Sequence, residues 1–248
     1  MSRMKFMNTE IDNLTMDEAL RRIDKLIQKN NNAYVVTPNV NHIVRLEKDK
    51  ELQEAYKHAD LILTDGKPLI WMSKWYGTPI KEKVSGSDLF YRLCEMAAIK
   101  DYGVFFLGAA EGVAEKAASK MMLQYPGLRV VGTLSPRNGF EKDEVELERI
   151  IRIVKAAAPQ ILMVCLGCPK QELFVFNHKQ QLGVPISLCI GASLDFAAGI
   201  VKRAPKWMSE HGVEWVFRIK QEPKRLLGRY VNDAICITKY FFKYWIKK

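Results

Sequence analysis

Short apolar runs alternate with longer segments of helical periodicity along most of this chain. Six of the runs are rich in β-branched residues and are predicted to be strands, at 34–37, 61–64, 104–107, 129–131, 161–166 and 186–190. Helices are predicted at 15–28, 41–58, 68–76, 88–99, 112–124, 142–157 and 170–181. The first helix begins with Thr15 and Glu18 at the spacing of a capping box. This alternation is typical of βα units, so we predict an α/β fold with a mainly parallel sheet and helices on both faces.

The length of 248 residues, with 48% hydrophobic content, suffices for one domain with a buried core plus an appendage. No apolar run approaches the ~20 residues that span a bilayer, and the N-terminus lacks the apolar centre of a signal peptide. We therefore expect a cytoplasmic protein. The five cysteines are an odd number and lie mostly in apolar runs, which predicts free thiols without a disulfide framework.

The net charge of +10 is concentrated near the C-terminus. Residues 202–248 hold twelve lysines and arginines against four acids, so they carry +8 of that charge. The βα alternation also stops near residue 202. We therefore predict an α/β core at 1–201 and a basic, aromatic-rich appendage at 202–248.

Residues 230–246 of the appendage have the pattern of a basic amphipathic helix. The residues predicted to share one side of it are Val231, Ala234, Ile235, Thr238, Phe241, Phe242 and Trp245. A helix with this composition suits the surface of an anionic membrane. The alternative is that this side packs on the protein's own core.

Polar and glycine-rich segments follow five of the predicted strands, at 37–41, 64–67, 108–112, 167–172 and 191–195. Ligands of parallel α/β sheets bind beyond the carboxyl ends of the strands. We therefore expect these five segments to converge on one rim of the sheet and to form the functional site.

Asp65 is the carboxylate best placed to act as a general base. It follows an apolar strand, and Gly66 leaves the backbone beside it open, so partial burial would raise its pKa to a useful range. The alternative is an ordinary Asp-Gly turn. Similarly, segment 108–112 could hold a diphosphate at a helix N-terminus, or it could be only a tight turn.

Metal or redox chemistry is not expected from the sequence. Cys165 and Cys168 have the spacing of a metal or redox pair, but no second pair exists. The acidic pairs at 49/51 and 143/144 lie in charged helical segments and are interpreted as solvated. Four histidines show no ligand spacing and are expected to be solvated or to cap helices: His42, His58, His178 and His211.

Several blocks of residues together resemble the WecG/TagA/CpsF family of bacterial glycosyltransferases. They lie at 37–39, 64–66, 83–89, 106–108, 166–172, 191–196, 202–205 and 214–225. The resemblance covers nearly the whole chain in the right order. It implies an inverting transferase with a Rossmann-like core and a C-terminal appendage that reaches the membrane and completes the site.

The resemblance also implies roles for particular residues. Asp65 matches the general base, and Thr37, Asn39 and Gln171 match residues that hold the donor sugar and the reacting centre. The remaining matched positions are expected to bind substrate: Lys83, Gly86, Asp88, Gly108, Pro169, Glu172, Ser193, Asp195, Arg203, Arg218 and Arg225, together with the neighbouring Arg229. Asp195 is expected to meet the uridine, and the appendage arginines suit a diphosphate because they bind phosphate through paired donors.

The expected reaction is transfer of a sugar from a UDP-sugar to an undecaprenyl-diphosphate-linked N-acetylglucosamine, in teichoic acid or surface polysaccharide synthesis. N-acetylmannosamine is the first choice of donor sugar. Glucosyl and N-acetylmannosaminuronic acid donors stay open because Lys67 and Pro68 follow the Asp-Gly pair. Separately, Lys83 stands where arginine is expected, which keeps the charge but loses the paired donors. We expect no metal requirement, a peripheral location on the inner face of the membrane and no nucleic-acid partner. The sequence leaves open whether the chain forms a homo-oligomer.

Two other classes of protein fit the sequence less well. A nicotinamide-dependent oxidoreductase would need a full glycine fingerprint after a strand, which is missing here. A nucleic-acid-binding protein would use the basic appendage, but its aromatic residues follow one helical side.

Overall fold

The computed structural model describes residues 3–246, and a six-stranded parallel sheet forms its centre. The strand order is β4-β3-β8-β7-β5-β6, and every neighbouring pair is parallel. The strands are β3 Ala33–Val36, β4 Leu61–Ile62, β5 Gly103–Gly108, β6 Arg129–Leu134, β7 Ile161–Cys165 and β8 Ile186–Cys189. All six correspond to predicted strands, so the predicted α/β class with a mainly parallel sheet is confirmed.

Helices cover both faces of the sheet because alternate residues of each strand point to opposite sides. One face carries α1 Met16–Lys29, α5 Gly86–Lys100, α6 Val113–Gln124 and α9 Ser193–Ala198. The other carries α2 Val40–Leu46, α3 Lys50–Lys57, α7 Glu144–Ala157 and α8 Lys170–Leu182. In β5, for example, Val104 and Phe106 pack on the first face, whereas Phe105 and Leu107 pack on the second. Strands covered on both sides are apolar throughout, which explains the continuous apolar runs.

The predicted helix at 41–58 is wrong as a single element. It is divided into α2 and α3, because the Asp49 side chain accepts a hydrogen bond from the Leu52 backbone N–H (3.0 Å) and caps a new helix. The capping box at Thr15 and Glu18 is confirmed, with both reciprocal hydrogen bonds present.

An antiparallel hairpin that the sequence analysis missed precedes the sheet. It consists of β1 Arg3–Phe6 and β2 Thr9–Asp12. Asp12 pairs with Arg3 (3.0 Å) and also accepts a hydrogen bond from the backbone N–H of Ile62 in β4 (2.8 Å). The hairpin therefore protects the edge strand of the sheet.

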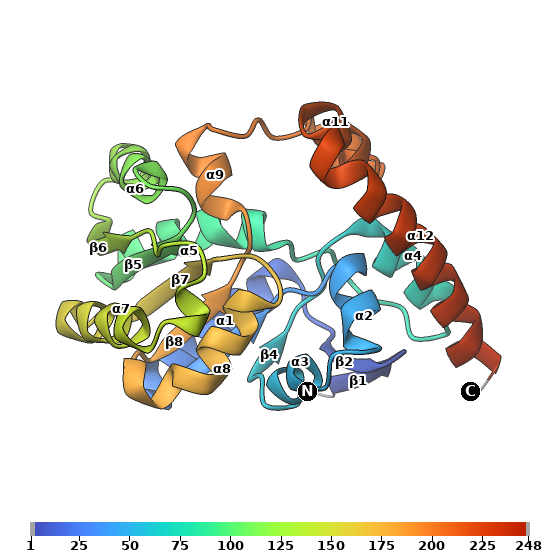
Figure 1. Cartoon of the computed structure of the whole chain (residues 1–248), viewed down its shortest axis with the longest axis horizontal. Helices are drawn as coiled ribbons and strands as arrows, with labels where there is room; N and C mark the ends of the chain where they lie inside the picture. The colour runs from blue at the N-terminus through green and yellow to red at the C-terminus, as the bar shows by residue number, and fades with distance from the viewer. Residues whose placement is uncertain (1–2, 247–248) are drawn as a thin grey trace.

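The C-terminal part forms α10 Lys206–Glu210, α11 Glu214–Gln221 and α12 Pro223–Ile246. Figure 1 shows α12 running along one end of the molecule beside α2 and α4 (Lys67–Trp75), far from β6 and α7. Asn41 in α2 donates two hydrogen bonds to the buried carboxylate of Asp233 in α12, both 3.1 Å long. The appendage is thus joined to the core by buried contacts.

The side of α12 that packs on the core differs from the predicted apolar side. Leu226, Ile237, Tyr240 and Phe241 are buried, and of these only Phe241 belongs to the predicted set. The most apolar members of that set stay largely exposed: Val231, Ile235, Phe242 and Trp245. The helix therefore has two apolar sides. Within residues 3–246, no helix combines the length and the apolar character that a membrane span requires.

Candidate active site

A cavity of about 770 Å³ lies between the carboxyl ends of the strands and the C-terminal helices. The loops after β3, β4, β7 and β8 form one wall, and α11 and α12 form the other. The predicted site residues that line it are Thr37, Asn39, Asp65, Lys83, Gln171, Ser193, Arg218, Arg225 and Arg229. Its volume is within the range of small-molecule sites, so four of the five predicted segments and the appendage arginines meet at one cavity.

Asp65 is held where the chain passes from β4 into α4. Its backbone N–H donates to the Pro38 carbonyl (2.8 Å), and Gly66 takes a φ of 103°, a backbone conformation that L side chains rarely adopt. Its carboxylate lines the cavity and accepts no hydrogen bond from any residue in the described range. Burial raises the pKa of Asp65 to about 7, with Lys83 opposing the shift and Glu214 adding to it. An acid of this pKa can exchange a proton near neutrality.

Thr37 and Gln171 tie the loops around the cavity to each other. The Thr37 hydroxyl donates to the carbonyl of Cys189 in β8 (3.0 Å), so its oxygen can still accept a hydrogen bond from a ligand. The Gln171 Oε1 accepts from the Gly191 N–H (3.0 Å), and its Nε2 donates to the carboxylate of Glu172 (2.8 Å). Both side chains are held in place by the protein before any substrate arrives.

Asn39 caps α2 with its carboxamide oxygen, which accepts from the Asn41 N–H (3.0 Å) and contacts His42 Nδ1 (2.8 Å). Its carboxamide nitrogen is therefore the group left to donate to a ligand. The capping role expected for the histidines is confirmed for His42, but the alternative of a solvated side chain is wrong there because His42 is buried. Although desolvation acts in the opposite direction, the Cys168 and Glu172 groups raise the pKa of His42 to about 10.

Arg218 is the most enclosed of the three appendage arginines that line the cavity. Its side chain is 14% exposed, its guanidinium lies over the Phe196 ring at 4.9 Å, and its buried Nε has no hydrogen-bond partner in residues 3–246. Arg225 donates to Glu222 (2.8 Å), and Arg229 lies over Tyr230. A buried guanidinium N–H without a partner is costly, so Arg218 is arranged to receive an acceptor from a ligand.

Lys83 belongs to a charged cluster beside the cavity. Its ammonium donates to the Ser209 hydroxyl (2.9 Å) and lies 3.4 Å from Asp88. Asp88 also pairs with Arg203 and accepts from Ser85 (2.6 Å), and these contacts overcome desolvation and lower the pKa of Asp88. Asp88 and Arg203 do not line the cavity. They join α5 to the segment that leads into the appendage.

Three other predicted residues lie outside the cavity wall and have packing roles. A Cβ on Gly86 would come within 3.1 Å of Ile190 and Thr37, so glycine lets α5 approach the loops. A Cβ on Gly108 would lie 2.4 Å from the Cys165 carbonyl oxygen, which makes this glycine necessary where β5 meets β7. No residue of 108–112 lines the cavity, so the geometry favours the tight turn over the diphosphate loop. Pro169 caps α8 after a cis peptide bond with Cys168.

Asp195 and Glu172 also lie behind the cavity wall. Burial raises the pKa of Asp195, and the positive charge of Arg218 opposes this shift. Glu172 is fully buried and lies 3.3 Å from His42 Nε2. Sequence reasoning missed Glu214, which lines the cavity and raises the pKa of Asp65, although it lies in a matched block.

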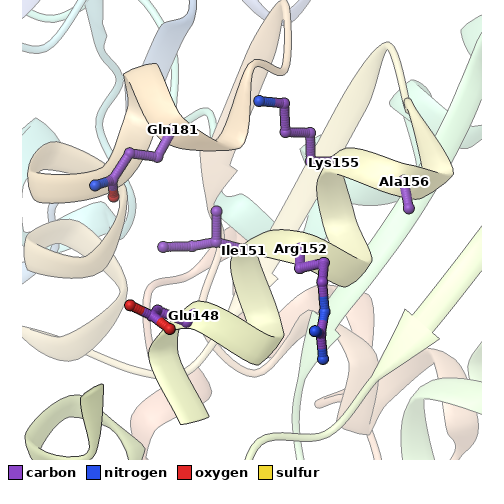
Figure 2. A pocket seen from close by; sticks show the side chains of 6 residues that line it. All are labelled: Glu148, Ile151, Arg152, Lys155, Ala156 and Gln181. Atoms are coloured by element: carbon purple, nitrogen blue, oxygen red, sulfur yellow. The ribbon is translucent and has the colours of Figure 1, made fainter. Parts of the chain in front are cut away.

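A second hollow, of about 550 Å³, lies between α7 and α8 (Figure 2). It is lined by Glu148, Ile151, Arg152, Lys155, Ala156 and Gln181. None of these residues follows a strand, and none was predicted to belong to the site. The cavity at the strand ends is therefore the candidate active site.

A parallel α/β fold that faces a carboxylate of near-neutral pKa with arginines across a cavity has the arrangement of a group-transfer enzyme acting on phosphorylated substrates. Residues 4–248 match the model of the glycosyl transferase WecG/TagA/CpsF family. The chain belongs to this family and is a glycosyltransferase.

Three relatives carry the same name, N-acetylglucosaminyldiphosphoundecaprenol N-acetyl-β-D-mannosaminyltransferase. The Bacillus spizizenii protein is 30% identical over 80% of this chain and 75% of its own length. The Bacillus subtilis protein is 29% identical over 73% of this chain and 70% of its own length. A Staphylococcus aureus protein is 26% identical over 96% of this chain and 92% of its own length. At 96% coverage, the similarity to the last relative extends into the appendage helices.

Proposed function

We propose that this enzyme transfers N-acetylmannosamine from its UDP form to N-acetylglucosaminyl-diphospho-undecaprenol, with inversion at the anomeric carbon. The activity named for the relatives supports this substrate pair. The observation that carries the mechanism is the placement of Asp65 and the appendage arginines around one cavity. Glucosyl and N-acetylmannosaminuronic acid donors are the alternatives.

In the proposed step, the acceptor hydroxyl oxygen forms a bond to the anomeric carbon while the bond from that carbon to the diphosphate oxygen breaks. The Asp65 carboxylate accepts the hydroxyl proton, and UDP leaves with the bonding electron pair. Arg218, Arg225 and Arg229 stabilise the charge that develops on the diphosphate. Thr37, Asn39 and Gln171 orient the sugar through the groups described above.

A donor comparison with mass spectrometry of the lipid product tests this assignment. The purified enzyme is incubated with a short-chain diphospho-lipid acceptor and, separately, the UDP forms of N-acetylmannosamine, glucose and N-acetylmannosaminuronic acid. We expect UDP release and a product heavier by one N-acetylhexosamine with the first donor only. A folded enzyme that releases UDP with none of the three would contradict the proposal.

The reaction is proposed to need no metal at the diphosphate, because guanidinium groups supply the positive charge there. We expect the initial rate to change less than about twofold when Mg²⁺ or Mn²⁺ is added to gel-filtered enzyme, since arginine stays charged and needs no bridging ion. Turnover that depends on either added ion would show that a metal holds the leaving group.

The pH profile of kcat/KM follows from the raised pKa of Asp65. The carboxylate accepts a proton only when ionised. The logarithm of kcat/KM, plotted against pH, should therefore fall with a slope of one below about pH 7 and level off above it. Steady-state rates from about pH 5.5 to about pH 8.5 measure this limb. A flat profile across that range would remove Asp65 from the role of base.

The outer side of α12 is proposed to rest on the anionic inner face of the cell membrane. Val231, Ile235, Phe242 and Trp245 are exposed there, and the exposed Lys239 lies on the same helix. Apolar side chains would enter the headgroup boundary while lysines meet anionic lipids. This location would place the cavity near a lipid-linked acceptor.

Replacing both Ile235 and Phe242 by serine should weaken binding to phosphatidylglycerol vesicles by roughly tenfold or more, because each loses a large apolar group. Co-sedimentation measures the effect, with Val145→Ser, an exposed apolar residue on α7, as the matched control. Equal binding by both variants would contradict the proposed membrane contact. Stronger binding of wild type to duplex DNA than to vesicles at the same salt would favour a nucleic-acid partner instead.

A further inference from the structure

Three side chains of different chemistry meet at the wall of the cavity. They are His42 from α2, Cys168 from the loop after β7, and Glu172 from α8. Their potential ligand atoms all lie within 4.8 Å of one another, and His42 Nε2 is 3.3 Å from Glu172 Oε1. His42 and Cys168 also line the cavity, whereas Glu172 is fully buried.

Two atoms of this cluster are buried without a hydrogen-bond partner in the described part of the chain. They are His42 Nε2 and Glu172 Oε2. Buried polar atoms are nearly always paired. A third such atom is the Tyr56 hydroxyl, whose pKa is raised chiefly by burial and further by the nearby Glu172 charge. These unpaired atoms indicate that the cluster binds something besides its own side chains.

The neighbouring hydrogen bonds orient both groups as ligands. Asn39 contacts His42 Nδ1 twice, donating its backbone N–H at 3.3 Å and placing its side-chain Oδ1 at 2.8 Å, so the imidazole ring is fixed with Nε2 toward Glu172. A cation at His42 Nε2 would replace the proton that this atom carries in the imidazolium form. On the other side, Gln171 Nε2 donates to Glu172 Oε1 at 2.8 Å. Outer hydrogen bonds of this kind orient the ligands of metal sites.

We propose that His42, Cys168 and Glu172 bind one Zn²⁺ ion. A thiolate, an imidazole nitrogen and a carboxylate oxygen form a ligand set that suits zinc, and three protein ligands leave a fourth position toward the cavity. The Cys168 thiol and the His42 imidazolium release their protons when the ion binds. Cys165, the other member of the Cys-x-x-Cys spacing, is buried in β7 and takes no part.

The ion would connect the N-terminal end of α2 to that of α8. These are the two ends that carry Asn39 and Gln171, so zinc would fix both side chains at the cavity through their hydrogen bonds to its ligands. This role is separate from the diphosphate, where arginines supply the charge. The site stands on the buried cluster alone and does not depend on which sugar is transferred.

Metal binding to the purified full chain tests the proposal without an activity assay. The protein is stripped with a chelator and then titrated with Zn²⁺ against a chromophoric competitor, and separately with Co²⁺. We expect one zinc per chain and a thiolate-to-cobalt charge-transfer band. Wild-type protein that binds neither ion stoichiometrically would overturn the proposal and leave a buried water as the occupant.

Variants then identify the ligands. Cys168→Ser should abolish the cobalt–thiolate band and weaken zinc binding by more than about 100-fold, beyond the range typical of outer-shell changes. Cys236→Ser, at a partly exposed cysteine on α12, is the matched control and should retain both. Circular dichroism establishes that each variant is folded. A folded Cys168→Ser protein that keeps the band and the affinity would contradict the assignment.

Discussion

Asp65→Asn is expected to lower kcat by on the order of 10²-fold or more while the KM for the donor changes little. Asparagine has nearly the same shape but cannot accept the hydroxyl proton, and removal of a general base has effects of this size. Burst and steady-state rates of UDP release measure the loss. Glu111→Gln, an exposed residue after β5, is the matched control and should keep full activity.

The same substitution is expected to stabilise the fold at alkaline pH. The pKa of Asp65 rises from 3.8 to about 7 on folding because of burial, so the native state binds the proton more tightly than the unfolded state. Stability therefore falls as the pH rises from about 4 to about 7, and asparagine removes this loss. Thermal unfolding should show a higher Tm for Asp65→Asn than for wild type at pH 8, and a smaller difference near pH 4. A lower Tm at pH 8 would show that the carboxylate has a structural role.

Arg218→Ala is expected to reduce kcat by about 10²- to 10³-fold, the range found when one preorganised donor to a developing anion is removed. Arg218 is enclosed against Phe196 and keeps an unpaired Nε, so it can bind a phosphate oxygen without first giving up a protein hydrogen bond. Single-turnover kinetics with a saturating donor separate this loss from weaker binding.

Two variants sharpen the arginine test. Lys220→Ala, at an exposed residue on the same helix, should behave like wild type. Arg218→Lys keeps the charge but loses the planar pair of donors, so it should recover only part of the rate. Deleting the whole appendage would be a poorer test, because Leu226, Ile237 and Phe241 are buried and their removal would expose the core. If Arg218→Ala turned over like Lys220→Ala, the appendage arginines would have no part in stabilising the leaving group.

The strands were predictable because a sheet covered on both faces favours continuous apolar runs, as in β7. The hairpin β1–β2 could not be predicted from the sequence, because each of its strands has only one buried residue, Phe6 or Ile11. The hairpin depends instead on its contact with β4. The division of 41–58 depended on one side chain, Asp49, which stabilises a helix start more than the periodic pattern reveals.

The candidate site shows the same division at the level of single residues. Asp65 could be selected from the sequence because the end of a parallel strand is where ligands bind. The raised pKa of Asp65 could not be predicted from the sequence. It depends on the burial of that carboxyl group and on Lys83 and Glu214, which other segments of the chain bring to the cavity. The histidines gave no ligand spacing along the chain, yet His42 lies beside Cys168 and Glu172 across 126 or more positions of sequence.

The order and chemistry of the βα segments, and the presence of a basic appendage, were determined by the sequence alone, because periodicity and composition act locally along the chain. The tertiary structure decided which side of α12 is buried, which matched residues face the cavity, and which only support it. Those outcomes depend on contacts between segments far apart in the sequence, such as Asn41 with Asp233 and Gln171 with Gly191. A sequence pattern does not give the distance between such segments, so only the folded structure could show these contacts.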